Sequence, residues 1–276
     1  MEEIFAVGNN VNVEVQTSGG SIEVIGSKRD NVHVEMFVKQ RGKEIDAKKV
    51  DLDDWDITIK KKGNTVYAIA KKRKKISWGR DNFSVSFIVH SPVDSKADVK
   101  SSGGGITLEN LEGDQRAKTS GGSITASQII GEVHLHTSGG SITLDEIEGN
   151  IQAHTSGGRI RATAINGEIL AKTSGGSITL EDILGNVEAR TSGGSIHAEI
   201  VKPDEYIDLK TSGGSISVTV PEEGGYDINL DGTRVRVKLA NFDGDYEKDK
   251  IKGTLNGGGI RLTAKTSGGT VTMKYF

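Results

Sequence analysis

Cationic and imidazole side chains recur along the middle of the sequence at a nearly constant interval. They are Lys118, His136, His154, Lys172, Arg190 and Lys210. The interval is 18 residues between successive members from Lys118 to Arg190, and 20 residues from Arg190 to Lys210. Like charges stacked this closely repel each other, so a sequence selected for stability alone would avoid them. The column therefore predicts an anion-binding stripe, and solvated cations with partners across the turn are the alternative.

The histidine side chains at these positions also suggest a metal site. His134 lies two residues before His136, and His154 follows one interval after His136, so three imidazoles fall on one predicted face. Three such ligands can hold zinc. Exposed repeat positions that happen to be histidine are the simpler interpretation, because no carboxylate is evident to support them. We therefore expect no metal and no cofactor.

A second basic cluster precedes the repeats. It comprises Lys60, Lys61 and Lys62, then Lys71 to Lys75 around Arg73, and Trp78 and Arg80 follow it. Basic residues beside an aromatic ring are typical of sites for nucleic acid or anionic sugar. A solvated hairpin, balanced by the aspartates between Asp51 and Asp56, is the alternative. The net charge of −3 and the pI near 6.1 do not indicate a nucleic-acid partner.

The sequence offers no catalytic motif. Cysteine is absent, the recurring Ser-Gly-Gly is not a G-x-S-x-G nucleophile elbow, and the glycine-rich turns lack the lysine of a phosphate-binding loop. A polysaccharide lyase on a β-helix would need clustered Asp, Lys and Arg, which the repeats do not show. The expected protein is therefore not an enzyme, and the serine side chains are expected to cap the turns.

The elements that position these side chains follow from the repeat itself. Thr-Ser-Gly-Gly begins at Thr119, Thr137, Thr155, Thr173 and Thr191, always one repeat interval after the last. Each unit divides into two halves that alternate apolar and polar residues, which predicts two strands and two turns. The turn glycines are expected to supply positive φ. They are Gly121, Gly122, Gly139, Gly140, Gly157, Gly158, Gly175, Gly176, Gly193 and Gly194.

Residues one repeat apart also form apolar columns. One column holds isoleucine throughout, including Ile160 and Ile178, and the next alternates large and small, as Ala162 and Leu180 show. Such alternation lets stacked layers interdigitate. The pattern favours an all-β fold, a β-solenoid (β-helix) with 18-residue coils of two strands each. An antiparallel meander fits the same spacing and is the alternative.

The period divides the chain into three parts. Residues 101–220 form the regular stack, while 1–100 and 221–276 are irregular β segments that would cap its ends. Strands are expected near 11–15 and 83–89, with a hairpin over 57–70. The last interval, from Thr191 to Thr211, is longer than the others, with Lys202-Pro203 as the two-residue excess. The pattern resumes at Gly257 and again at Thr266, so we expect one continuous domain.

These turns and their order resemble a bacterial family of putative adhesins of unknown biochemical activity. The matching residues are 17–22, the six regular turns from Ser101, 211–216, Val220-Pro221 and 266–271. The resemblance covers nearly the whole chain and implies a β-helix and export, but no ligand.

The start of the sequence, MEEIFAVGNN, lacks the features of a leader, and no apolar run is long enough to span a membrane. We therefore expect an exported protein whose leader is absent from this chain, with a cytoplasmic location as the alternative. The expected function is a non-enzymatic surface scaffold or adhesion-like module that binds anionic glycan or a cell-envelope protein. A self-assembling structural protein is the alternative.

Overall fold

The fold is all-β throughout the part of the chain that is described. The computed structural model describes residues 1–40, 43–46, 52–73 and 83–276, and these contain no helix. The chain separates into two units, Met1–Ser138 and Gly139–Phe276, and each is considered by itself. The expected division at residues 100 and 220 stays a prediction.

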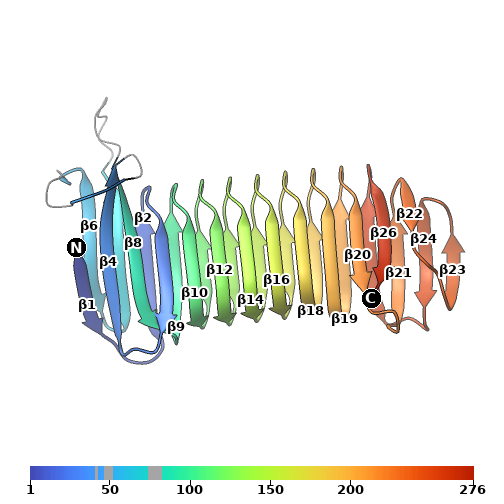
Figure 1. Ribbon diagram of the computed structural model, residues 1–276, viewed down its shortest axis with the longest axis horizontal. Helices are drawn as coiled ribbons and strands as arrows, with labels where there is room; N and C mark the ends of the chain where they lie inside the picture. Colours follow the sequence, from blue (N-terminus) through green and yellow to red (C-terminus); the bar gives the residue numbers. More distant parts are fainter. Residues whose placement is uncertain (41–42, 47–51, 74–82) are drawn as a thin grey trace. The chain divides into compact units, whose positions relative to one another are not determined.

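The described residues of unit 1 form strands β1 to β13 (Figure 1). They are β1 (Glu2–Ala6), β2 (Val11–Thr17), β3 (Ile22–Ser27), β4 (Asn31–Gln40), β5 (Lys43–Ile45), β6 (Trp55–Lys62), β7 (Thr65–Lys72), β8 (Phe83–Pro92), β9 (Ser95–Ser101), β10 (Ile106–Glu112), β11 (Gln115–Lys118), β12 (Ile124–Ile130) and β13 (Val133–His136). The strands expected near 11–15 and 83–89 are confirmed.

Unit 2 has the same construction. Its strands are β14 (Ile142–Glu148), β15 (Ile151–His154), β16 (Ile160–Asn166), β17 (Ile169–Lys172), β18 (Ile178–Arg190), β19 (Ile196–Thr211), β20 (Ile216–Val220), β21 (Tyr226–Asp231), β22 (Arg234–Arg236), β23 (Phe242–Tyr246), β24 (Lys250–Leu255), β25 (Ile260–Thr266) and β26 (Thr270–Tyr275).

Parallel pairing at the repeat interval builds the regular part of unit 2. Ile160 of β16 lies between Ile142 of β14 and Ile178 of β18. On the second ladder Ala171 is paired in the same way with the alanines one repeat before and after it. Residues one repeat apart are therefore neighbours, as a solenoid-like stack requires and an antiparallel meander does not.

The column of alternating large and small interior residues also packs as predicted. Leu180 is fully buried between Ala162 and Ala198, its register partners on the two neighbouring strands, and both alanines are fully buried. At this position one large side chain thus packs between two small ones. Close packing of this kind leaves little space for added or removed methyl groups.

A third interior column was not predicted. Ile147, Ile165 and Ile183 are buried, although they break the strict alternation of their strands. The reason is a left-handed residue just before each one. Ala164, with a φ of 54°, makes two successive side chains face outward, and Ile165 then returns to the interior. The left-handed position holds Glu146, Ala164 or Asp182 in these strands, so no residue type marks it in the sequence.

The repeat threonines hold neighbouring turns together. The hydroxyl of buried Thr173 donates to the carbonyl oxygen of Gly158 at 2.8 Å and accepts the N–H of Gly176 at 3.3 Å. Thr155, Thr191 and Thr211 make the corresponding pair of bonds in their own turns. The capping role expected of serine therefore belongs in these turns to the preceding threonine.

Thr173→Val is expected to lower the free energy of unfolding by about 1–3 kcal/mol, because the partly buried carbonyl of Gly158 loses its donor while the shape of the side chain is kept. Ser174→Ala in the same turn is the control, since Ser174 is exposed and its loss is expected to have little effect. Urea unfolding followed by circular dichroism measures both variants. Equal stability of the two would contradict this role for the threonine hydroxyl.

The turn glycines do not have the conformation expected of them. None of the ten adopts positive φ, whereas Gly167 (145°) and Gly185 (129°), in the second turn of each repeat, do. In the Ser-Gly-Gly turns the second glycine is instead required by the close approach of the neighbouring backbone. A Cβ on Gly176 would lie 2.0 Å from the carbonyl oxygen of Gly158.

The two-residue excess lies slightly later than predicted. Lys202 and Pro203 stay in register with Leu184 and Gly185, whereas residues 204–206 lie opposite Asn186 alone. The surplus residues are accommodated as an irregularity of the β18–β19 pair. They place Tyr206 immediately before Ile207, where regular pairing with β18 resumes.

The irregular segments of both units continue the same ladders. In unit 1, β2 and β3 pair in parallel with β9 and β10, while β6 and β7 form the expected antiparallel hairpin around Gly63, whose φ is 61°. In unit 2, β25 and β26 pair in parallel with β19 and β20. The pattern therefore resumes after the excursion, as expected. Of the intervening strands, β21 and β22 pair in parallel with β25 and β26, whereas β24 pairs antiparallel with β21 and β23.

Candidate ligand-binding face

The predicted stripe forms a column of register partners within each unit. In unit 2, His154, Lys172, Arg190 and Lys210 occupy successive strands at the same height. In unit 1, Lys118 lies between His136 and Lys100. The parallel ladder positions each of these side chains, because residues at equivalent points of successive strands face the same side.

The structure adds two lysines that the sequence analysis did not include. Lys100 precedes Lys118 in unit 1, and Lys265 of β25 follows Lys210 in unit 2. The fixed interval does not reach Lys265, because strands β20 to β24 separate it from Lys210 along the chain. The local signal was nevertheless present, because Lys-Thr-Ser-Gly-Gly occurs both at 210–214 and at 265–269.

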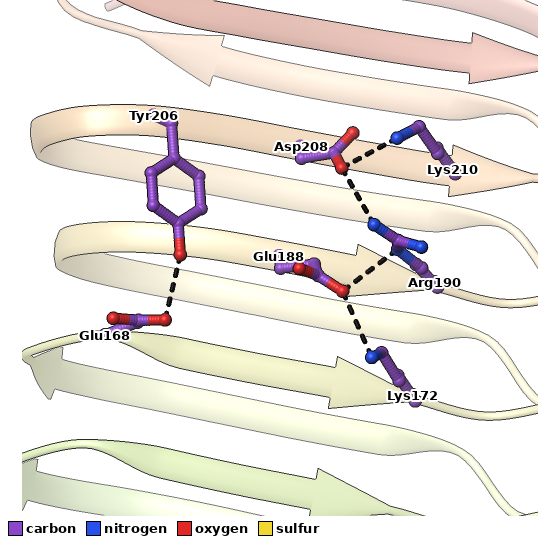
Figure 2. Close-up of polar contacts among 7 residues, drawn as sticks. All are labelled: Glu168, Lys172, Glu188, Arg190, Tyr206, Asp208 and Lys210. Carbon is purple, nitrogen blue, oxygen red and sulfur yellow. Dashed lines mark hydrogen bonds and ion pairs between the residues drawn. The ribbon is translucent and has the colours of Figure 1, made fainter.

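Carboxylates interleave with the cations in unit 2 (Figure 2). Glu188 lies 3.2 Å from Lys172 and 3.0 Å from Arg190, and Asp208 lies 3.2 Å from Arg190 and 2.8 Å from Lys210. These partners come from the neighbouring column of the same face and not from across a turn. They relieve the repulsion between stacked cations, although half-exposed pairs such as these contribute only about 0–1 kcal/mol each.

Lys265 differs from the cations before it. Thr263 occupies the position where Glu188 and Asp208 stand in the preceding strands. Within the described part of the chain no ion pair involves Lys265. Lys210 and Lys265 border a hollow of about 410 Å³, together with Asp231 and the hydroxyl-bearing turn residues around Thr266. Asp231 of β21 is the register partner of Lys265 on the next strand, but no ion pair joins Lys265 to a carboxylate among the described residues.

Unit 1 has a similar but smaller arrangement. Lys100 forms an ion pair with Asp98 at 2.9 Å. Lys118, beside it, is exposed and forms no ion pair with any described residue of the chain. Its ammonium group is thus available to an anion, as the predicted stripe requires.

The zinc alternative gains no support. His134 lies 3.6 Å from Glu132, which the sequence analysis did not recognise as its neighbour. Across the described residues, no group of three His, Cys, Asp or Glu side chains is placed to hold a metal ion.

A different histidine cluster lies on the outer face of unit 1. His33 of β4 and His90 of β8 are register partners whose rings are stacked 6.0 Å apart. Glu35 lies 3.7 Å from His33 and 3.4 Å from His90. The sequence analysis missed this cluster, because antiparallel pairing of β4 with β8 joins residues that no repeat relates.

The second basic cluster is only partly described. Trp78, Arg80, Lys74 and Lys75 lie outside the described residues, as does Asp51. Arg73 donates to Asp56, with 2.7 Å from its Nε to Oδ1, and this hydrogen bond lowers the pKa of the Asp56 carboxyl. The contact agrees with the interpretation of this region as a solvated hairpin.

Comparison with known proteins identifies the family. The Toastrack DUF4097 family model matches residues 10–274. The chain belongs to this family. The family resemblance predicted from the turns of this Toastrack protein is therefore confirmed.

Two solved structures are similar to the Toastrack chain at low sequence identity. One is described as a putative adhesin from Bacteroides fragilis, at 13% identity and a TM-score of 0.40, covering 100% of this chain and 96% of that one. The other is described as a putative cell adhesion protein from Clostridium sporogenes, at 10% identity and a TM-score of 0.25, covering 100% and 99%. No curated protein matches the chain. Among the described residues, no helix has the length and apolar character needed to cross a membrane.

Proposed function

We propose that this Toastrack protein is a non-enzymatic, adhesion-like binding module that docks an anionic glycan along its cationic column. The observation that carries the proposal is the end of the column in unit 2. There Lys265 stands beside Lys210 at a hollow of about 410 Å³, with no carboxylate paired to it in the described residues. An ammonium group in this position attracts a sulfate or carboxylate group of a glycan.

The parallel ladder suits an extended ligand. Successive cations of the column are separated by one strand spacing, roughly 4.8 Å, so a linear polyanion lying across the strands would meet several of them. Glu188 and Asp208 already pair with three of the cations in unit 2. They compete with the ligand, so the binding is expected to be moderate and to weaken as salt screens the charges.

The irregular segments fit this scaffold role. An open ladder presents unpaired N–H and C=O groups at its end and invites pairing with another chain. Residues 1–100 and 221–276 supply strands that continue the ladders and then turn antiparallel. We therefore assign them as caps of a β-solenoid with 18-residue coils, which opposes self-assembly through the ends. A cell-surface or periplasmic location follows from an adhesion-like role.

Lys265→Gln tests the proposal, with Lys248→Gln as a control of equal charge change outside the column. We expect the native protein to be retained on heparin at low salt and released at physiological salt. Lys265→Gln is expected to weaken binding of a heparin oligosaccharide by roughly two- to fivefold, as for loss of one exposed ion pair. Lys248 is exposed, and its variant is expected to bind as the native protein does. No retention at low salt, or equal weakening by both variants, would overturn the proposal.

A further inference from the structure

The irregular part of the β18–β19 pair lies beside a hollow in the surface of unit 2. This hollow of about 510 Å³ lies beside the place where residues 204–206 face Asn186. Leu184 and Pro203, both half-buried, form its apolar part. A repeat presents nearly the same side chains on every coil, so an interruption is where a unique site can form.

Asparagine side chains on the rim are held by the backbone. Asn186 Oδ1 accepts the N–H groups of Glu205 at 2.9 Å and Tyr206 at 3.0 Å. Asn150 Oδ1 accepts the N–H of Glu168 at 3.2 Å. Both amide oxygens are thus engaged, and both NH₂ groups remain as donors at the edge of the hollow. Because the protein already fixes these side chains, a ligand would lose little affinity to ordering them.

Glu168 is positioned by a tyrosine two strands away. The Tyr206 hydroxyl donates to Glu168 Oε1 at 2.8 Å, as Figure 2 shows. Arg261 lies over the tyrosine ring, with its guanidinium carbon 5.6 Å from the ring centre. Burial, and then the bond to Glu168, raises the pKa of Tyr206 to about 12, so the hydroxyl remains a donor at neutral pH. The contact leaves Glu168 Oε2 as an acceptor for a ligand.

The charges of the hollow disfavour an acidic ligand. Its charged lining residues are Glu168, Asp204 and Lys202, which give one more negative than positive charge. A carboxylate acceptor beside amide donors matches adjacent sugar hydroxyls, each of which both donates and accepts. Two apolar side chains beside polar groups that the protein already fixes are a feature of small-molecule sites. This combination differs from the cationic column and goes beyond the anionic-glycan function proposed above.

We infer that this hollow binds one neutral sugar ring of a saccharide. Glu168 accepts from a sugar hydroxyl, Asn150 and Asn186 donate to hydroxyl oxygens, and Leu184 and Pro203 contact the apolar face of the ring. Tyr206 is a positioning residue, which acts through Glu168.

Saturation-transfer NMR with the methyl glycosides of glucose, galactose, mannose and N-acetylglucosamine tests the inference on the full chain. We expect at least one glycoside to bind, with a Kd that a titration then measures. Glu168→Gln, which keeps the shape and removes the charged acceptor, is expected to raise that Kd at least about tenfold. Tyr206→Phe is expected to raise it by a smaller factor, because it only frees the Glu168 side chain. Glu199→Gln, which is on β19 but outside the hollow, is the matched control.

The outcomes separate this site from the cationic column. Loss of glycoside binding in Glu168→Gln, with unchanged heparin retention and an unchanged thermal midpoint, supports the inference. Absence of glycoside binding by the native protein overturns it, whether or not heparin is retained. Equal glycoside affinity of native protein and Glu168→Gln also overturns it. Failure of heparin binding alone overturns only the proposed function.

Discussion

Gly176→Ala is expected to destabilise the protein by about 3 kcal/mol, near the upper end of the usual cost of overpacking. Gly175→Ala, one residue earlier in the same turn, is expected to have only a small effect. The difference arises because a Cβ on Gly176 would lie 2.0 Å from the Gly158 carbonyl oxygen and 2.4 Å from its carbon. The nearest atom to a Cβ on Gly175 is 3.5 Å away, which is ordinary contact.

The Gly158 carbonyl has little freedom to move away. Its oxygen accepts the Thr173 hydroxyl at 2.8 Å, and the two turns are also joined by the N–H of Gly175, which donates to the Ser156 carbonyl at 2.9 Å. Relief of the clash would therefore break bonds between neighbouring turns. Urea-unfolding midpoints of the two alanine variants and the native protein measure the difference. Similar midpoints for both variants would show that the turns can separate at low cost.

Leu180→Ala is expected to lower the free energy of unfolding by about 2–5 kcal/mol, the range for removing a buried leucine. Leu180 is fully buried, and its register partners on both sides are alanines. Neither neighbour has a side chain long enough to fill the cavity. Thr179→Ala on the outer face of the same strand is the control, and it is expected to change stability by only about 0.5 kcal/mol.

Adding Ala162→Leu to Leu180→Ala tests whether the two positions share one interior layer. Ala162→Leu alone is expected to cost about 1–3 kcal/mol by overpacking. In the double variant the larger side chain enters the space left at position 180, so the summed cost should fall by about 1 kcal/mol or more. Additive effects would contradict direct packing between residues one repeat apart. Chemical unfolding of the four proteins in the cycle gives the coupling energy.

Much of the candidate site could be recognised from the interval alone. The fixed repeat interval places Lys172 and Arg190 in one column, because each repeat adds one strand to the same ladder. The repeat interval does not predict that Lys265 joins this column, because strands β20 to β24 lie between β19 and β25 along the chain. Ion pairs such as Arg190 with Asp208 depend on side-chain reach between neighbouring strands and required the structure.

The hollow beside Asn186 also could not be predicted from the sequence. The sequence contains a two-residue excess, but which residues leave the register depends on how β18 and β19 pair. Lys202 and Pro203 stay paired because they continue the strand, and the surplus is absorbed at 204–206. That choice brings Tyr206 to Glu168, which lies much earlier in the chain.

The sequence by itself determined the all-β class and favoured stacking at the repeat interval, because periodic apolar residues specify which positions must meet in the interior. Its turn motifs indicated the family. Only the tertiary structure decided why the second turn glycine is required, which hydroxyl joins the turns and where the third interior column lies. These features depend on distances between neighbouring strands and on left-handed residues such as Ala164, whose side chain gives no local sign of its backbone conformation.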